Sequence, residues 1–127
     1  MGLASRVLIA DDHEAMRRGL RSLLGEAGFN VVDEASNGRE AVKKTRSESP
    51  DLVILDVSMP EMNGLAAARE ISRENPKVKI LIYTMHEPNS LREEALRAGA
   101  HGVIGKCDPV SDLVAAIRST LDSISKS

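Results

Sequence analysis

The sequence predicts an α/β protein in which a doubly wound parallel sheet is covered by helices on both faces. The segment Leu52–Leu55 is a continuous apolar run bounded by turn-forming residues, which is typical of a strand buried on both faces of a parallel sheet. Strand-like and helix-like segments also alternate strictly along the chain, five of each. This alternation favours parallel strands joined by right-handed crossover connections.

The length of the chain favours one domain. A chain of 127 residues buries roughly two-thirds of the surface that its unfolded form exposes. We expect a single domain over residues 1–127, with its core at about residues 6–124 and a frayed tail from Ser123 onward.

Five segments have the composition of β-strands. Each is short and is followed by polar or turn-forming residues, which indicates where the strand ends. The predicted strands are Arg6–Ala10, Asn30–Ala35, Leu52–Leu55, Lys79–Thr84 and Gly102–Gly105.

The first helix is predicted from apolar residues that recur at helical spacing. Asp12 is its expected N-cap and Gly28 its expected end. The residues of the apolar face are Met16, Leu20, Leu23, Leu24 and Ala27.

The next two helices are predicted mainly from their end signals. Asn37 and Glu40 have the spacing of a capping box, and the helix that they begin stops before Pro50. Asn63 is the expected cap of the third helix, which ends before Pro76.

The last two helices differ in the strength of their signals. The fourth is weaker, with Leu91 on its apolar face and Gly99 at its end. For the fifth, Asp108 is the expected N-cap and Pro109 the first helical residue. Its apolar face consists of Val110, Leu113, Ile117, Leu121 and Ile124.

Composition argues against several classes of function. Aromatic residues make up only 2%, which argues against base stacking on single-stranded nucleic acid. The net charge of −2 gives no overall attraction to nucleic acid or membranes. Cys107 is the single cysteine, so no disulfide forms within the chain, and no apolar run approaches membrane-spanning length. These features predict a cytoplasmic protein.

Charged and hydroxyl side chains follow four of the five predicted strands. Asp11 and Asp12 come directly after the first strand, and Asp56 comes directly after the third. Thr84 ends the fourth strand, and Lys106 follows the fifth. Because the carboxyl ends of parallel strands lie along one edge of a sheet, we expect these five side chains to converge.

This set of side chains predicts a site for Mg²⁺ and a phosphoryl group. Three carboxylates in close proximity raise one another's pKa unless a cation compensates their charge. Mg²⁺ uses one or two carboxylates and keeps other positions for water or phosphate oxygens. Thr84 and Lys106 would then bind phosphoryl oxygens that the metal does not reach. An aspartate such as Asp56 can itself attack phosphorus and form an aspartyl phosphate.

The segments LVILDVSMPEMNG, LIADDH, LIYT and GVIGK together resemble the receiver domain of bacterial two-component response regulators. The resemblance extends from about Val7 to Ile124. The opening DDHEAMRRGL resembles the NarL/FixJ-like branch, whose members carry a LuxR-type helix-turn-helix output domain. The resemblance implies a flavodoxin-like (βα)5 fold with strand order 2-1-3-4-5.

The resemblance also implies the roles of the acidic residues. Asp56 matches the phosphoacceptor, which receives a phosphoryl group from a phosphohistidine on a sensor histidine kinase. Asp12 matches the direct carboxylate ligand of Mg²⁺, with Mn²⁺ as an alternative ion, and Asp11 matches the acid that acts through a bound water. The backbone carbonyl of Ser58 would complete the protein ligands together with Asp56.

Thr84 and Lys106 match the pair of residues that contact the phosphoryl group and relay its arrival. The sequence departs from the family pattern at Val103, where family members commonly have Tyr or Phe. A β-branched valine has no ring to rotate and a stiff χ1, so the usual aromatic switch does not operate at this position.

Four hypotheses follow. The first is a phosphorylation-dependent receiver, which promotes transfer to its own Asp56 but does not turn over an external substrate. The second is a receiver that acts only as a phosphorylation-independent interaction module, which Val103 favours. The third is a haloacid-dehalogenase-like phosphatase, but Ser58 stands where such enzymes have a general acid. The fourth is a flavin-binding module, but Asp11 and Asp12 would repel its phosphate.

Expected partners follow from the first hypothesis. They are a sensor histidine kinase and, on phosphorylation, a second copy of the chain. The chain itself has no DNA-binding element, so DNA would be reached only through an output domain that is absent or truncated. His13 is set aside as a ligand because Mg²⁺ prefers oxygen, and His86 lies where the family tunes phosphoryl lifetime.

Overall fold

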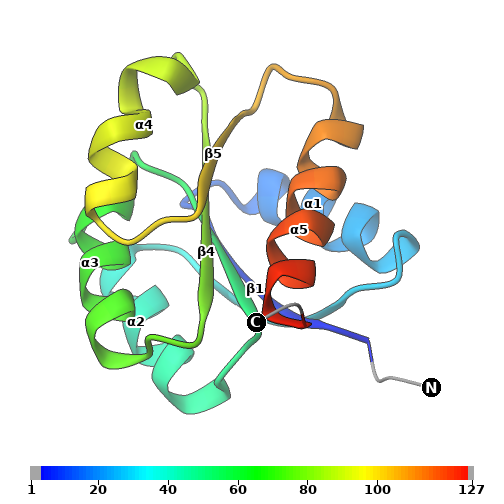
Figure 1. Cartoon of the computed structure of the whole chain (residues 1–127), viewed down its shortest axis with the longest axis horizontal. Helices are drawn as coiled ribbons and strands as arrows, with labels where there is room; N and C mark the ends of the chain where they lie inside the picture. Colours follow the sequence, from blue (N-terminus) through cyan, green and yellow to red (C-terminus); the bar gives the residue numbers. More distant parts are fainter. Residues whose placement is uncertain (1–3, 126–127) are drawn as a thin grey trace.

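The computed structural model describes residues 4–125 and consists of one five-stranded sheet with helices on both faces (Figure 1). The strands have the predicted bounds. They are β1 (Arg6–Ala10), β2 (Asn30–Ala35), β3 (Leu52–Leu55), β4 (Lys79–Thr84) and β5 (Gly102–Gly105). The helices are α1 (Glu14–Glu26), α2 (Gly38–Glu48), α3 (Gly64–Glu74), α4 (Pro88–Arg97) and α5 (Val110–Ser125).

All neighbouring strands are parallel, and their order is β2-β1-β3-β4-β5. The predicted fold class and strand order are therefore confirmed. All four residues of β3 are buried, as expected for a strand at the centre of a sheet that is covered on both faces.

Two apolar layers lie between the sheet and its helices. Helices α2, α3 and α4 cover one face, and α1 and α5 cover the other (Figure 1). Side chains alternate between these layers along each strand. Leu55 and Ile82, for example, belong to the α2–α4 layer, whereas Ile54 and Tyr83 belong to the α1/α5 layer. The core is mainly aliphatic, as the composition predicts, with Tyr83 as a buried aromatic side chain.

The predicted caps of the second and third helices are confirmed. The Asn37 side chain accepts a hydrogen bond from the Glu40 backbone N–H at 2.8 Å, and Asn63 accepts one from Ala66 at 2.9 Å. The Glu40 carboxylate reaches back to the backbone N–H of Ser36, one residue before the cap.

Two predicted caps are wrong. Helix α1 has His13, not Asp12, at its N-cap position, and His13 makes no side-chain capping bond. The backbone N–H of His13 donates to the Asp11 carboxylate at 2.9 Å. Helix α5 begins at Val110, one residue after Pro109. The Asp108 carboxylate accepts from the Gly105 N–H instead, closing the turn after β5.

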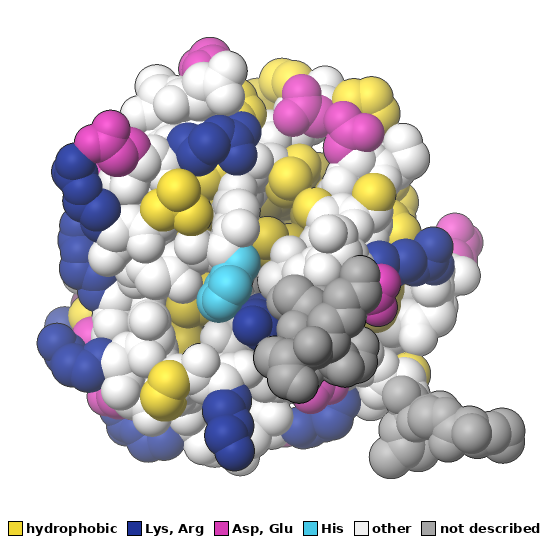
Figure 2. Space-filling model, viewed as in Figure 1, with side chains coloured by type: hydrophobic (Ala, Val, Ile, Leu, Met, Phe, Trp, Pro, Cys, Tyr) yellow, Lys and Arg dark blue, Asp and Glu magenta, His cyan; other side chains and the backbone are white. Residues whose placement is uncertain are grey.

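Helix α5 packs on the sheet through only part of its predicted face. Leu113 and Ile117 are buried and Leu121 is partly buried, whereas Val110 is exposed. The helix continues to Ser125, and the frayed tail from Ser123 stays a prediction. The side chains of residues 123–125, including Ile124 of the predicted face, and the whole of residues 126–127 lie outside the described part. Hydrophobic side chains gather between α4 and the start of α5 (Figure 2).

Among residues 4–125, no helix has the length and apolarity to cross a membrane.

Candidate functional site

The residues predicted to form the site converge at the carboxyl edge of the sheet. Asp11 directly follows β1 and Asp56 directly follows β3, and both are buried, with 1% and 5% exposure. The Asp56 N–H donates to the Ala10 carbonyl at 3.0 Å, so the pairing of β1 with β3 extends to the first atoms of the site. Thr84, the last residue of β4, is fully buried.

Lys106 links the two buried acids. Its side chain is only 4% exposed, and its Nζ donates to Asp11 Oδ2 at 2.6 Å. The same Nζ lies 3.5 Å from Asp56 Oδ1. A side chain that follows the edge strand β5 therefore reaches across β4 and β3 to the end of β1. The prediction that Lys106 converges with the acids is confirmed, and its direct bond to Asp11 is an addition.

Asp56 is in an unfavourable environment for a charged carboxylate. Burial raises the pKa of Asp56 above its ordinary value, and the charges of Asp11 and Asp12 raise it further. Lys106 and the backbone N–H of Ser58 lower the pKa but do not cancel the effect of burial. An additional cation at this position would favour the ionised form of Asp56.

Four side chains at this edge are close enough to share a metal ion. One ligand atom from each lies within 4.8 Å of the others; the residues are Asp11, Asp12, His13 and Asp56. Three of them offer carboxylate oxygens, which suit Mg²⁺. Together with the raised pKa of Asp56, this donor set fits a divalent cation.

His13 is in this group although the sequence argued against it. Its Nδ1 lies 3.2 Å from Asp11 Oδ1 and 3.1 Å from Asp12 Oδ1. Its ring is largely exposed, at 73% of the side chain. The ring therefore contacts the outer rim of the acid cluster, and the buried side of the cluster consists of oxygen ligands alone.

The mouth of the site is bridged by two loops. Ser58 Oγ, after β3, lies 3.2 Å from Nε2 of His86, after β4. The His86 backbone N–H donates to the Thr84 hydroxyl oxygen at 3.0 Å. The Thr84 hydroxyl oxygen therefore accepts a hydrogen bond from the loop that follows β4. The O–H of the same hydroxyl can still act as a donor. The Ser58–His86 contact has no signal in the sequence, because the two residues belong to different loops.

Gly64 explains the close approach of α3 to the site. A Cβ at this position would lie 2.1 Å from the Asp56 carbonyl oxygen. Asn63 caps α3 directly before this glycine, so the Asn63–Gly64 pair both starts the helix and lets its first turn pack on the Asp56 backbone.

Val103 is buried in the α2–α4 layer, with 3% exposure. No aromatic side chain therefore occupies the position where the family pattern has one. The aromatic side chain close to Lys106 is Tyr83, on the opposite face of the sheet, and Lys106 Nζ lies 6.0 Å from the centroid of its ring. No motif or local pattern in the sequence marks Tyr83 as a residue of the site.

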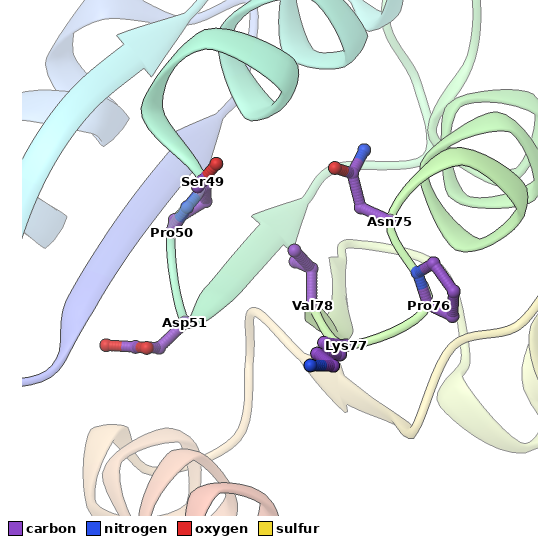
Figure 3. Close-up of a pocket in the computed structure, with 7 residues that line it drawn as sticks. All are labelled: Ser49, Pro50, Asp51, Asn75, Pro76, Lys77 and Val78. Atoms are coloured by element: carbon purple, nitrogen blue, oxygen red, sulfur yellow. The ribbon is translucent and has the colours of Figure 1, made fainter.

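A cavity of about 410 Å³ opens at the other edge of the sheet (Figure 3). The loops that precede β3 and β4 face each other across it. Its lining residues are Ser49, Pro50, Asp51, Asn75, Pro76, Lys77 and Val78. None of the predicted site residues lines this cavity, so cavity size does not locate the acid cluster.

Residues 7–118 match the family model described as the response regulator receiver domain. The chain therefore belongs to the response regulator receiver family. It is 44% identical over 114 residues to the response regulator UvrY of Escherichia coli K12, covering 89% of this chain and 52% of UvrY. It is 41% identical over 115 residues to the chemotaxis protein CheY of Thermotoga maritima, covering 91% of this chain and 96% of CheY. The chain thus spans about half the length of UvrY and nearly all of CheY.

Solved structures give the same fold. A LuxR-family two-component response regulator from Aurantimonas sp. SI85-9A1 superposes with a TM-score of 0.90 at 35% identity, covering 94% of this chain and 86% of that one. The CheX–CheY–BeF3–Mg²⁺ complex from Borrelia burgdorferi gives 0.88 at 28% identity, covering 93% and 90%. The resemblance seen in the sequence is confirmed at the level of family and fold.

Proposed function

We propose that this chain is a phosphoacceptor receiver that takes a phosphoryl group from a sensor histidine kinase onto Asp56. The observation that carries the proposal is the position of Asp56. It is a buried carboxylate at the end of the central strand, with Lys106 Nζ at 3.5 Å and further acids beside it. Such a group is costly to bury unless a cation or a reaction requires it.

The chemistry needs positioning and charge compensation more than acid–base groups. An oxygen of Asp56 attacks phosphorus, and an O–P bond forms while the N–P bond of the phosphohistidine breaks. The electron pair of that bond goes to the imidazole nitrogen, which takes up a proton. Lys106 supports the reaction in two ways, since it favours the ionised form of Asp56 and compensates charge on the transferred group.

Mg²⁺ would be held by Asp12, Asp56 and the backbone carbonyl of Ser58, with Asp11 acting through a water; Mn²⁺ is an alternative. When bound, the ion neutralises the negative charge that accumulates between the carboxylates and the phosphoryl oxygens. Asp11 suits an indirect role because Lys106 and the His13 N–H already occupy its two oxygens. The CheX–CheY–BeF3–Mg²⁺ complex is a structural relative that contains Mg²⁺.

The output would follow from a population shift. Thr84 and Lys106 would contact the phosphoryl oxygens and favour a second arrangement of the loop after β4 and of α4. Such a receiver is not a turnover enzyme on an external substrate. The part that matches this chain makes up 52% of UvrY, and a LuxR-family regulator is among the structural relatives. We therefore favour transcription control through a LuxR-type output domain, with a homodimer forming on phosphorylation.

A phosphorylation-independent interaction receiver is the second candidate. The observation in its favour is Val103, a buried valine that cannot act as the rotating ring of the family pattern. This candidate predicts the same fold but no functional response to phosphorylation.

The test is intact mass after incubation with phosphoramidate, with and without Mg²⁺. We expect the parent to gain one phosphoryl group only with Mg²⁺, and Asp56→Asn to gain none. Asp51→Asn is the matched control, because Asp51 flanks the same strand at its other end. A folded parent that gains no mass, or an Asp56→Asn variant that gains as much as the parent, would contradict the proposal.

A further inference from the structure

Tyr83 is the aromatic side chain that faces the site's cation. Lys106 Nζ lies 6.0 Å from the centroid of the Tyr83 ring. Both side chains are almost completely buried, with 4% exposure for Lys106 and 6% for the tyrosine residue. The face of an aromatic ring attracts a cation at this distance, and the attraction is stronger when both groups are shielded from water.

The sheet places the two side chains on the same side. Tyr83 pairs with Ile104 across β4 and β5, and both belong to the α1/α5 layer. Lys106 comes directly after β5, and its backbone N–H donates to the Thr84 carbonyl at 2.6 Å, so the pairing with β4 continues to this residue. Because Lys106 is two residues after Ile104, the two-residue period of the pairing directs its side chain to that same side. Val103 is on the other side, where it packs in the α2–α4 layer. The contact thus follows from the strand register.

The ring complements the acids that bind Lys106. An ammonium group on a four-carbon stem has many conformations available to it, and a single acceptor does not fix its direction. Here the group donates to Asp11 at 2.6 Å, lies 3.5 Å from Asp56, and has the ring of Tyr83 beside it. Its charge also lowers the pKa of Tyr83 against the larger, opposing effect of burial.

We propose that Tyr83 is a positioning residue for Lys106, which directs the ammonium group toward Asp11 and Asp56 and connects its position to the surface between α1 and α5. The role in phosphoryl transfer rests on the proposed function, whereas the contact itself does not. Tyr83 lines a cavity of about 400 Å³ whose other residues come from α1 and the start of α5, among them Met16, Leu20 and Val110. The Tyr83 ring therefore borders both Lys106 and this cavity.

The contact is tested on the unphosphorylated protein. Tyr83 is the single tyrosine and the chain has no tryptophan, so tyrosine fluorescence reports on this ring alone. We expect Lys106→Met to change the Tyr83 emission. Arg118→Met is the matched control, because Arg118 lies 5.9 Å from the centroid of the Phe29 ring in the same layer and should leave the emission unchanged. An unchanged emission in Lys106→Met would overturn the proposal even if Asp56 accepts phosphate.

The positioning role is tested by rates of phosphorylation from phosphoramidate with Mg²⁺, followed by intact mass. We expect Tyr83→Leu to slow the reaction about threefold to tenfold, which lies between the sizes of an exposed and of a fully shielded cation–ring contact. Tyr83→Phe keeps the ring and should stay within about twofold of the parent. Phe29→Leu removes the other ring–cation pair of this layer, so it should also stay within about twofold.

A double-mutant cycle separates positioning from packing. If Tyr83 acts through the ammonium group, Tyr83→Leu has no further effect on the rate in the Lys106→Met background. Full additivity of the two substitutions would overturn the proposal, and so would a Tyr83→Phe variant as slow as Tyr83→Leu. If the parent gains no phosphoryl mass at all, the proposed function fails, and the fluorescence comparison still decides whether Lys106 and Tyr83 are coupled.

Discussion

The two ends of strand β3 carry the same residue type in opposite environments. Asp51 directly precedes Leu52–Leu55, and Asp56 directly follows it. Asp51 is exposed, and its carboxylate accepts the Arg6 backbone N–H at 2.8 Å. Its carbonyl accepts the N–H of Lys79, so one residue connects the starts of three strands. Asp56 is buried beside other acids, with Lys106 as its nearby cation.

The difference shows how one sheet separates stability from chemistry. At the amino edge, the polar groups of Asp51 accept hydrogen bonds from backbone N–H groups. Removing such an acceptor leaves an N–H without its hydrogen-bond partner. At the carboxyl edge, like charges are brought together under burial, which raises the pKa of Asp56 and disfavours its ionised form. Asp51 at the amino edge therefore stabilises the fold, whereas the ionised form of Asp56 at the carboxyl edge reduces its stability.

The largest expected effect comes from Gly64→Ala, which disturbs the backbone of Asp56 directly. The new Cβ would lie 2.1 Å from the Asp56 carbonyl oxygen, and backbone atoms cannot move aside cheaply. We expect a loss of about 2–3 kcal/mol in the free energy of unfolding, measured in urea, and slower phosphorylation. Gly25→Ala in α1 is the control, since nothing lies within 4 Å of its Cβ, and it should gain about 0.5–1 kcal/mol. Equal stabilities of the two variants would contradict this account of Gly64.

The amino edge is tested by Asp51→Ala. This substitution removes the acceptor of the Arg6 N–H, so we expect the free energy of unfolding to fall by about 1 kcal/mol. The rate of phosphorylation from phosphoramidate should not change, because Asp51 is at the far end of β3 from the acid cluster. If Asp51→Ala slows phosphorylation but leaves the free energy of unfolding unchanged, the amino edge affects the reaction and not the stability, which would contradict this division between the two edges.

At the carboxyl edge, the corresponding substitution should have the opposite sign. Asp56→Asn removes a charge that burial and like charges disfavour, so we expect it to stabilise the protein by about 1 kcal/mol at pH 7 without Mg²⁺. The raised pKa means that the folded parent holds a proton more tightly than the unfolded chain does. The difference in stability between the parent and Asp56→Asn should therefore shrink as the pH falls toward 3.8, the ordinary pKa of the carboxyl group. Urea unfolding of both proteins between pH 7 and pH 3.8 measures this difference in stability. An Asp56→Asn variant that is less stable than the parent at pH 7 would contradict the prediction.

The sequence was sufficient for the strands and for the composition of the site. The bounds of all five strands were predicted correctly because each is an apolar run limited by polar or turn-forming residues. The convergence of Asp11, Asp56 and Lys106 followed from topology alone, since parallel strands end at one edge. The roles of Thr84 and Ser58 in binding phosphate and metal remain predictions.

What the sequence missed are contacts that depend on rotamers and loop paths. Asp11 and Asp12 have equal local signals for capping α1, and only the folded turn shows that Asp11 takes the backbone N–H. Asp108 likewise has the pattern of a cap but closes the turn after β5. The ring of Tyr83 beside Lys106 depends on the register of β4 with β5, which no local pattern encodes.

The smallest expected effect concerns His101, at the start of β5 on the amino edge. Its Nδ1 accepts the Ile80 backbone N–H at 3.1 Å, so this contact requires a nitrogen without a proton. Burial and the nearby charge of Lys79 lower the pKa of His101 below its ordinary value of 6.5. The unfolded chain therefore takes up the proton first, and the contribution of His101 to stability is present above pH 6.5 and is lost as the pH falls below it.

His101→Gln tests this contribution, because the amide oxygen of glutamine can accept the same N–H without titrating. We expect the variant to lose less stability than the parent when the pH falls from 7.5 to 5, by less than about 1 kcal/mol because the ring is partly solvated. His101→Ala should begin with lower stability at pH 7.5 and should also lack this acid-dependent loss. Thermal unfolding of the three proteins at both pH values provides the comparison. If parent and variants lose equal stability on acidification, the acid-dependent loss arises elsewhere, and the two edges do not differ in the sign of their pH dependence.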